Sequence, residues 1–168
     1  MLVIMAGLPA TGKSTLARAL SERSNGVVLD KDPIRRALFP PHEIEYSSEQ
    51  DDFCMELMLQ TAAYLWRRNP ERVVFLDGRT FSHEYQIRRA VEFAGSAGQP
   101  FRIIECVCSE ATARRRLEHD IAEQRHPAAN RDFALYLRVK AAFEPITLPK
   151  LIVNTDGPLA EAVAQATG

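Results

Sequence analysis

The sequence predicts an α/β fold in which a five-stranded parallel sheet is covered on both faces by helices. Two observations predict it. Short apolar runs alternate along the chain with segments whose apolar residues recur at helical spacing. That alternation is typical of a parallel sheet, because each connection between strands then crosses over through a helix. The chain has 168 residues with no repeat or linker, so we expect a single domain over residues 1–168.

Five short apolar runs are the expected strands, and polar residues follow them. The runs lie at residues 2–6, 27–29, 73–76, 101–107 and 151–153. Because ligands of an open parallel sheet bind beyond the carboxyl ends of its strands, we expect functional residues directly after these runs.

The expected helices lie between the strands and are delimited by residues that cap or break a helix. Serine accepts hydrogen bonds from first-turn N–H groups, proline cannot continue a helix, and glycine readily closes one. The expected helices are 14–23; 33–38, bounded by Pro33 and Pro40; 48–67, capped by Ser47 or Ser48; 82–97, capped by Ser82 and closed by Gly98; an arginine-rich helix capped by Ser109; 131–143; and 158–166.

A glycine-rich turn between the first strand and the first helix has the pattern G-x-x-x-x-G-K-[ST], a P-loop. Its glycines let several backbone N–H groups point at one anion, and the helix dipole adds positive potential there. The lysine of such a loop reaches the β- and γ-phosphates, and the next hydroxyl binds Mg²⁺. We therefore predict a nucleoside triphosphate site at Gly7, Leu8, Pro9, Ala10, Thr11, Gly12, Lys13, Ser14 and Thr15, with Ser14 as a metal ligand.

Asp32 and Arg35 follow the second strand. A carboxylate beside an acceptor hydroxyl can take its proton, so Asp32 is a candidate base. It is also a candidate N-cap of the helix that begins there, and spacing alone leaves both roles open. Arg35 lies one turn further along the same helix face, where it holds the substrate or the transferred phosphate, or is a surface charge.

Asp77 ends the third strand and is followed by Gly78, Arg79 and Thr80. A carboxylate at this point can hold Mg²⁺ or its waters opposite Ser14. Asp-Gly is also a common turn pair, but the P-loop upstream favours the metal role. Arg79 and Thr80 would then face the acceptor.

Arginines in the region 114–131 are candidates for closing over the phosphates, because phosphoryl transfer spreads negative charge over the γ-phosphoryl oxygens. Many charges on helices are simply solvated. The polar segment at about 118–130 is the expected lid. Arg116 and Arg125 are the first candidates and Arg131 is the third, while Thr155, after the last strand, is expected to border the adenine.

Composition disfavours several other classes of protein. A net charge of -1 argues against a general nucleic-acid or membrane-surface binder. Three cysteines, an odd number, provide no disulfide framework and suit a reducing cytosol. No apolar run is long enough to span a membrane, and Met1 leads directly into the first strand without a signal peptide. We therefore expect a cytoplasmic protein with no membrane partner, and the oligomeric state stays open.

Taken together, these motifs resemble the AAA_33-type P-loop kinase family, which borders gluconate kinase, chloramphenicol phosphotransferase, zeta toxin and the polynucleotide 5′-hydroxyl kinases. The resemblance rests on the loop at 7–15, the D-x-x-R pattern of Asp32 and Arg35, and the strand-end acid Asp77. It implies a nucleoside-kinase-like P-loop NTPase fold: three layers (αβα), a five-stranded parallel sheet and a helical lid. It also implies that Asp32 is the base and that Arg116 stacks on adenine.

We therefore expect an ATP-dependent, Mg²⁺-requiring kinase that moves the γ-phosphate of ATP to a hydroxyl of a small molecule. The expected catalytic residues are Lys13, Asp32, Arg35 and Arg125, and the expected acceptor contacts are Asp32, Arg35, Arg79, Thr80 and Arg131.

Two alternatives stay open at this point. The D-x-x-R pattern also permits a polynucleotide 5′-hydroxyl kinase, although the near-neutral charge disfavours a long strand lying across the surface. The other alternative is an ATP-binding switch or module that never transfers the phosphate.

Overall fold

A five-stranded parallel sheet forms the centre of the structure, as predicted. The computed structural model describes residues 1–122 and 132–168. The strands are β1 (Leu2–Ala6), β2 (Val27–Asp30), β3 (Val74–Asp77), β4 (Phe101–Val107) and β5 (Leu151–Asn154). They lie in the order β2-β3-β1-β4-β5, and each neighbouring pair is parallel. The strand that precedes the P-loop is therefore central, with neighbours on both sides.

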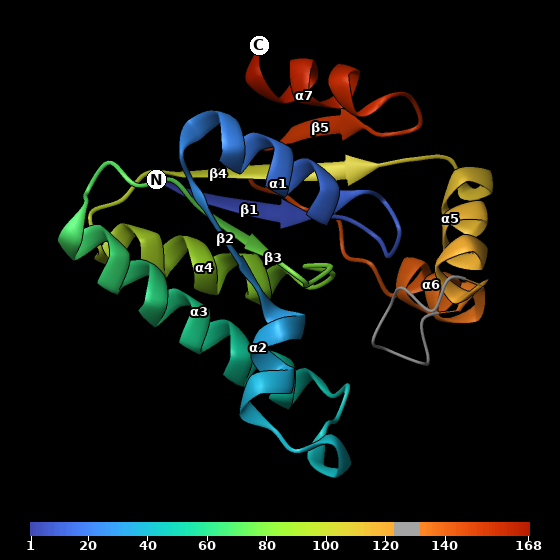
Figure 1. Ribbon diagram of the computed structural model, residues 1–168, viewed down its shortest axis with the longest axis horizontal. Coiled ribbons are helices and arrows are strands. Elements are labelled where there is room, and N and C mark those ends of the chain that lie inside the picture. The colour runs from blue at the N-terminus through green and yellow to red at the C-terminus, as the bar shows by residue number, and fades with distance from the viewer. Residues whose placement is uncertain (123–131) are drawn as a thin grey trace.

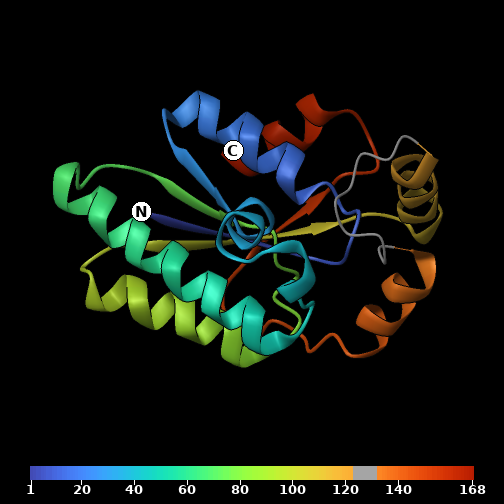
Figure 2. The same ribbon diagram turned by 60° about the horizontal axis from the view of Figure 1, so that its bottom comes forward.

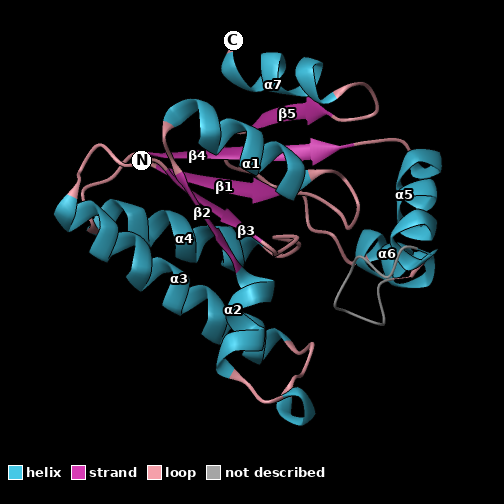
Figure 3. Cartoon of the chain, in the orientation of Figure 1, coloured by secondary structure: helices cyan, strands magenta, loops and turns pink. Residues whose placement is uncertain are grey.

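Helices cover both faces of this sheet (Figure 1). Within the described residues they are α1 (Lys13–Ser24), α2 (Lys31–Leu38), α3 (Ser48–Arg68), α4 (Glu84–Ser96), α5 (Glu110–Ala122), α6 (Phe133–Ala141) and α7 (Leu159–Thr167), with a short 3-10 helix at Pro41–Glu43. Helices α1 and α7 lie on one face, and α3 and α4 lie on the other (Figure 2). Helices α5 and α6 lie beyond the carboxyl ends of the strands (Figure 3).

The core around the sheet consists of two apolar layers, one on each face. Side chains alternate along a strand, so Leu2 and Ile4 of β1 pack toward α3 and α4, whereas Val3 and Met5 pack toward α1 and α7. All four are buried because helices cover both faces. This explains why β1 is a continuous apolar run rather than an alternating one.

Two predicted helix caps are wrong. Asp30, not Asp32, caps α2: its Oδ1 accepts the Asp32 N–H at 3.0 Å, because the helix begins at Lys31, directly after the end of β2. His83, not Ser82, is the N-cap of α4. The Ser82 carbonyl accepts the Glu144 N–H at 2.8 Å, which engages the chain there before the helix begins.

The predicted caps at Ser47 and Ser109 are confirmed, since their hydroxyl oxygens accept the N–H groups of Gln50 and Thr112 at 3.2 Å each. Helix α6 begins at Phe133, after its N-cap Asp132, and is shorter than the expected 131–143. In the described part of the chain, no helix has both the length and the apolar character needed to cross a bilayer.

The predicted lid at 118–130 is described only in part. Residues 118–122 form the last turns of α5. The remainder lies outside the described residues, and so do Arg125 and Arg131.

Candidate active site

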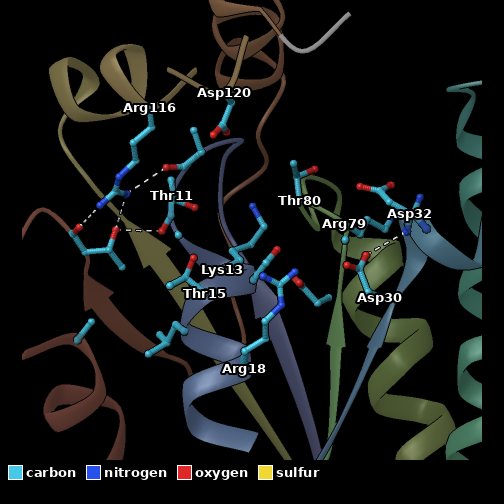
Figure 4. A pocket seen from close by; sticks show the side chains of 18 of the residues that line it. Thr11, Lys13, Thr15, Arg18, Asp30, Asp32, Arg79, Thr80, Arg116 and Asp120 are labelled. Carbon is cyan, nitrogen blue, oxygen red and sulfur yellow. Dashed lines mark hydrogen bonds between the residues drawn. The ribbon is translucent and has the colours of Figure 1, made fainter. Parts of the chain in front are cut away.

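A cavity of about 590 Å³ opens beyond the carboxyl ends of the strands, where ligands of such sheets bind (Figure 4). P-loop residues line one side of it, and residues that follow β2 and β3 line the other. The predicted site residues that line it are Ala10, Thr11, Gly12, Lys13, Ser14, Thr15, Asp32, Asp77, Arg79, Thr80, Arg116 and Thr155. The structure thus brings most of the predicted residues to one place.

The P-loop turns away from β1 at Gly7, where only glycine fits. Gly7 has a φ of 133°, and a Cβ there would lie 2.3 Å from the carbonyl oxygen of Cys106 in β4. The Gly7 N–H also donates to the carbonyl oxygen of Thr80 at 3.0 Å. The start of the loop is therefore fixed between β4 and the segment that follows β3.

Lys13 lies inside the curve of this loop and is buried. Its Nζ donates hydrogen bonds to the carbonyl oxygens of Gly7 at 2.9 Å and Leu8 at 2.7 Å. The loop therefore holds the ammonium group close to the cavity, at the start of α1 where the helix dipole is positive.

Arg116 and Thr155 connect the far side of the loop to α5 and to the end of β5. Arg116 donates to the carbonyl oxygens of Ala10 at 3.1 Å and Thr155 at 2.5 Å. The Thr155 hydroxyl donates to the carbonyl oxygen of Thr11 at 2.9 Å. These two predicted nucleotide residues therefore contact each other, and both brace loop residues that lie more than 100 positions away in the sequence.

Asp77 carries the clearest sign of a cation-binding site. Its side chain is 1% exposed, and among the described residues neither carboxylate oxygen has a hydrogen-bond partner. A buried ionised carboxylate is costly unless a donor or a metal satisfies it. Mg²⁺ commonly takes one or two carboxylates together with substrate phosphates and waters, and the Ser14 hydroxyl lines the same cavity. Ser14 and Asp77 fit a magnesium site.

Asp30 lies directly beside Asp77, since the two residues are paired in register across β2 and β3. Burial raises the pKa of the Asp30 carboxyl, and the neighbouring charges of Asp77 and Asp32 raise it further, against the hydrogen bond from the Asp32 N–H. The ends of these two strands therefore form an acidic pair that favours positive charge in the cavity.

Asp32 lines the side of the cavity opposite the P-loop, and Arg35 lies behind it. The Arg35 side chain is only 2% exposed, forms an ion pair with Asp51, and stacks on the Tyr46 ring at 5.3 Å. Its Nη1 lies 3.6 Å from Asp32 Oδ1. Within the described residues Arg35 does not line the cavity, so it can influence the cavity only through its neighbour Asp32.

Lys31 completes this cluster. Its Nζ lies 2.7 Å from Asp51 and 3.8 Å from Asp32. Burial lowers the pKa of the Lys31 ammonium to about 8, against the opposing effect of Asp32.

Arg79 forms the wall next to Asp32 and is 5% exposed. Its Nη1 donates to Asp52 at 2.5 Å and its Nη2 donates to the Tyr85 hydroxyl at 3.3 Å. Arg79 also lines a second cavity of about 480 Å³ between α3 and α4. It is therefore held in place from two helices.

Sequence analysis missed Asp51 and Asp52. Acidic residues in the first turn of α3 are explained by the helix dipole alone, and nothing local indicates another role. Their partners Lys31 and Arg79 lie 20 and 27 residues away in the chain. The signal that could have found them is a group of acidic residues at the start of the helix that follows the D-x-x-R pattern.

The parallel sheet, the glycine-rich loop after its central strand and the strand-end carboxylates define a P-loop nucleotide-binding protein with a kinase-like fold. The chain belongs to the AAA_33 family, described as an AAA domain, whose model matches residues 2–146. No protein of curated function matches the chain.

Solved structures share this fold. A proposed kinase from Chloroflexus aurantiacus is 24% identical with a TM-score of 0.76, over 98% of this chain and 95% of that one. A gluconokinase from Sinorhizobium meliloti is 18% identical (TM-score 0.70; 98% and 87%). The Mycobacterium tuberculosis APS kinase, in complex with AMPPNP and APS, is 17% identical (TM-score 0.72; 98% and 94%). Both the predicted family and the predicted fold are confirmed.

Proposed function

We propose that this protein is an ATP- and Mg²⁺-dependent kinase that transfers the γ-phosphate of ATP to a hydroxyl group of a small molecule. The observation that carries the proposal is one cavity whose two sides suit the two reactants. Backbone groups of the P-loop suit a triphosphate, and Asp32 on the opposite side suits an alcohol. The similarity to a gluconokinase and to an APS kinase supports a kinase.

On the nucleotide side, the amides of the loop hold the phosphates. Lys13 exchanges its carbonyl partners for the β- and γ-phosphate oxygens. Arg116 and Thr155, which brace the loop, border the adenine. Ser14 and Asp77 hold Mg²⁺, which when bound neutralises charge that develops on the phosphate oxygens.

On the acceptor side, Asp32 orients the alcohol and takes its proton as the new O–P bond forms and ADP leaves. Arg79 and Thr80 face the acceptor from the segment after β3. Arg35 acts from behind Asp32, consistent with its burial. Roles for Arg125 and Arg131 over the phosphates stay predictions, because both lie outside the described residues.

The test is a screen for an ATP-dependent gain in mass by sugars, nucleosides, hydroxy amino acids and aminoglycoside-like antibiotics, with Mg²⁺ present. An oligonucleotide with a free 5′-hydroxyl belongs in the same screen. Its labelling would favour the polynucleotide kinase instead. Tight ATP binding with no phosphorylated product from any acceptor would leave a binding module and overturn the proposal.

Asp32→Asn tests the assigned base once an acceptor is found. We expect transfer to fall by about 10²- to 10⁴-fold, because a general base contributes rate enhancements of that order. The affinity for ATP should stay unchanged, since Asp32 lies across the cavity from the loop (Figure 4). Glu22→Gln, an exposed residue of α1, is the matched control for losing one carboxylate. Full transfer by Asp32→Asn would remove Asp32 as the base.

A further inference from the structure

Four charged residues that pair unevenly lie at and behind the cavity wall formed by Asp32. Lys31 and Arg35 of α2 supply two cations, and Asp32 and Asp51 supply two carboxylates. Helix α2 packs against α3, and Asp51 lies in the first turn of α3. Both cations make their close contact with the same atom, Oδ1 of Asp51. Asp32 is left at 3.8 Å from Lys31 and 3.6 Å from Arg35.

We propose that Asp51 is a positioning residue for phosphoryl transfer, which binds Lys31 and Arg35 and so keeps both cations from pairing with Asp32. The inference rests on the kinase function proposed above. It assigns to Asp51 a role through Asp32, not a contact with either substrate, because among the described residues Asp51 does not line the cavity.

The pairing matters because a base needs an available oxygen. Within the described residues the carboxylate of Asp32 makes no hydrogen bond, and 26% of its side chain is exposed at the cavity. A candidate base must come within about 2.6–3.2 Å of the proton it removes. Cations in direct contact would occupy its oxygens with charge-assisted hydrogen bonds and make it a weaker base.

The two cations need a carboxylate partner, because both are buried. Lys31 is 6% exposed and Arg35 is 2% exposed, and a buried charge that loses its partner is strongly destabilising. The other charged neighbour, Arg79, is itself engaged by Asp52 at 2.5 Å. Burial raises the pKa of the nearby Cys54 thiol, so it supplies no negative charge.

Without Asp51, the remaining carboxylate within 4 Å of these cations in the described structure is Asp32. A movement of about 1 Å would bring either cation into hydrogen-bond distance of it. The cluster would also change from two positive and two negative charges to a net positive charge. Both effects direct Lys31 and Arg35 toward Asp32.

The first experiment compares crystal structures of the wild-type protein and of the Asp51→Asn variant, a nearly isosteric change, both as the full chain. We expect Lys31 Nζ and Arg35 Nη1 to move from 3.8 and 3.6 Å to direct hydrogen bonds with Asp32. Glu49→Gln is the matched control, because it removes a carboxylate from the same first turn of α3 and Glu49 is exposed. Cations that stay in place in Asp51→Asn would overturn the inference, and this readout needs no acceptor.

The second experiment measures transfer to the acceptor found in the screen. Asp51→Asn should lower kcat by about 10- to 100-fold, as expected for a weakened general base, and leave the KM for ATP unchanged. Asp51→Glu, which keeps the charge, should retain most of the activity. A rise in the KM for ATP with kcat preserved would indicate a structural role instead and would contradict the proposal.

A double variant distinguishes cation control from simple loss of stability. Lys31→Met in the background of Asp51→Asn removes one of the two released cations and restores charge balance. We expect it to raise kcat several-fold over Asp51→Asn, although Lys31→Met alone should not raise it. Equal or lower activity in the double variant would overturn the inference. Because its charges balance, this variant also serves if Asp51→Asn alone does not fold.

The two proposals fail in different ways. If the wild-type protein binds ATP but transfers phosphate to no acceptor, the kinase proposal falls, while the crystal structures still decide whether Asp51 holds the cations. If transfer occurs and Asp51→Asn transfers at the wild-type rate, the kinase proposal stands and the inference about Asp51 is wrong.

Discussion

The two sides of the cavity are built by different means. The nucleotide side is formed largely by the P-loop, whose consecutive residues 10–15 line the cavity and include the Lys13 side chain. The acceptor side consists of side chains from β2, α2 and the segment after β3, held by carboxylates of α3. Its ion pairs with α3 join residues 16 to 27 positions apart, from Arg35 and Asp51 to Arg79 and Asp52.

This difference has a consequence for specificity. A site made of backbone amides binds any phosphate chain of the right geometry and depends little on individual side chains. A site made of side chains in ion pairs can change with one substitution, and each pair must also compensate for its own desolvation. We therefore expect variants of the two sides to separate ATP binding from phosphoryl transfer.

Among the further variants that separate the two sides, Lys13→Met on the nucleotide side is expected to have the largest effect. In the proposed mechanism Lys13 contacts the transferring phosphate, so its loss would remove a positive charge from the transition state. We expect kcat to fall by about 10²- to 10³-fold, as when one preorganised donor is removed from an active site. Steady-state transfer with saturating ATP measures it. Transfer by Lys13→Met at the wild-type rate would show that the backbone groups of the P-loop are sufficient for catalysis on this side.

Gly78→Ala should cost the acceptor side about 2–3 kcal/mol of stability, since it combines strain with a steric clash. Gly78 has a φ of 87°, and a Cβ there would lie 2.7 Å from Asp30 Oδ1 and 2.8 Å from the Lys31 nitrogen. Urea unfolding measures the loss. Transfer should fall as the start of α2 shifts, while ATP affinity stays within about twofold.

Gly95→Ala is the matched control, because a Cβ at that position in α4 would meet nothing within 4 Å. Alanine should be neutral or stabilise the helix by up to about 1 kcal/mol. If Gly78→Ala proves equally harmless, the junction of β2 and α2 can move to accommodate the added methyl group, contrary to what the structure indicates.

The same contrast explains what the sequence could predict. The P-loop, its strand and its helix are determined by neighbouring residues, so their pattern predicts geometry directly. The strands were also predictable, because both faces of β1 are buried and its apolar run is continuous. The partners of Lys31 and Arg79 were not, because Asp51 and Asp52 are brought to them by packing of α3. Two helix caps were missed because a neighbouring residue takes the position: Asp30 instead of Asp32 at α2, and His83 instead of Ser82 at α4.

A smaller effect, confined to the acceptor side, is the pH dependence that buried Lys31 gives to stability. Burial lowers the pKa of its ammonium from the ordinary 10.5 to about 8. Between these values the unfolded chain binds a proton that the folded chain has lost, so the free energy of unfolding rises with pH. We expect the free energy of unfolding of wild type to rise by about 1–3 kcal/mol relative to that of Lys31→Met across this interval. Urea unfolding at several pH values measures it, and parallel curves would contradict it.

The smallest effect is expected for Thr155→Val, which removes a hydroxyl at nearly constant shape. That hydroxyl donates to the carbonyl oxygen of Thr11 at 2.9 Å and lies 3.3 Å from Arg116 Nη1. Losing a buried hydrogen bond costs about 1 kcal/mol, so the Kd for ATP should rise about fivefold. Calorimetry with a non-hydrolysable ATP analogue and Mg²⁺ measures it. The KM for the acceptor should not change, because Thr155 lies on the nucleotide side, remote from Asp32. A change in acceptor KM would show that the two sides of the cavity are coupled through the loop.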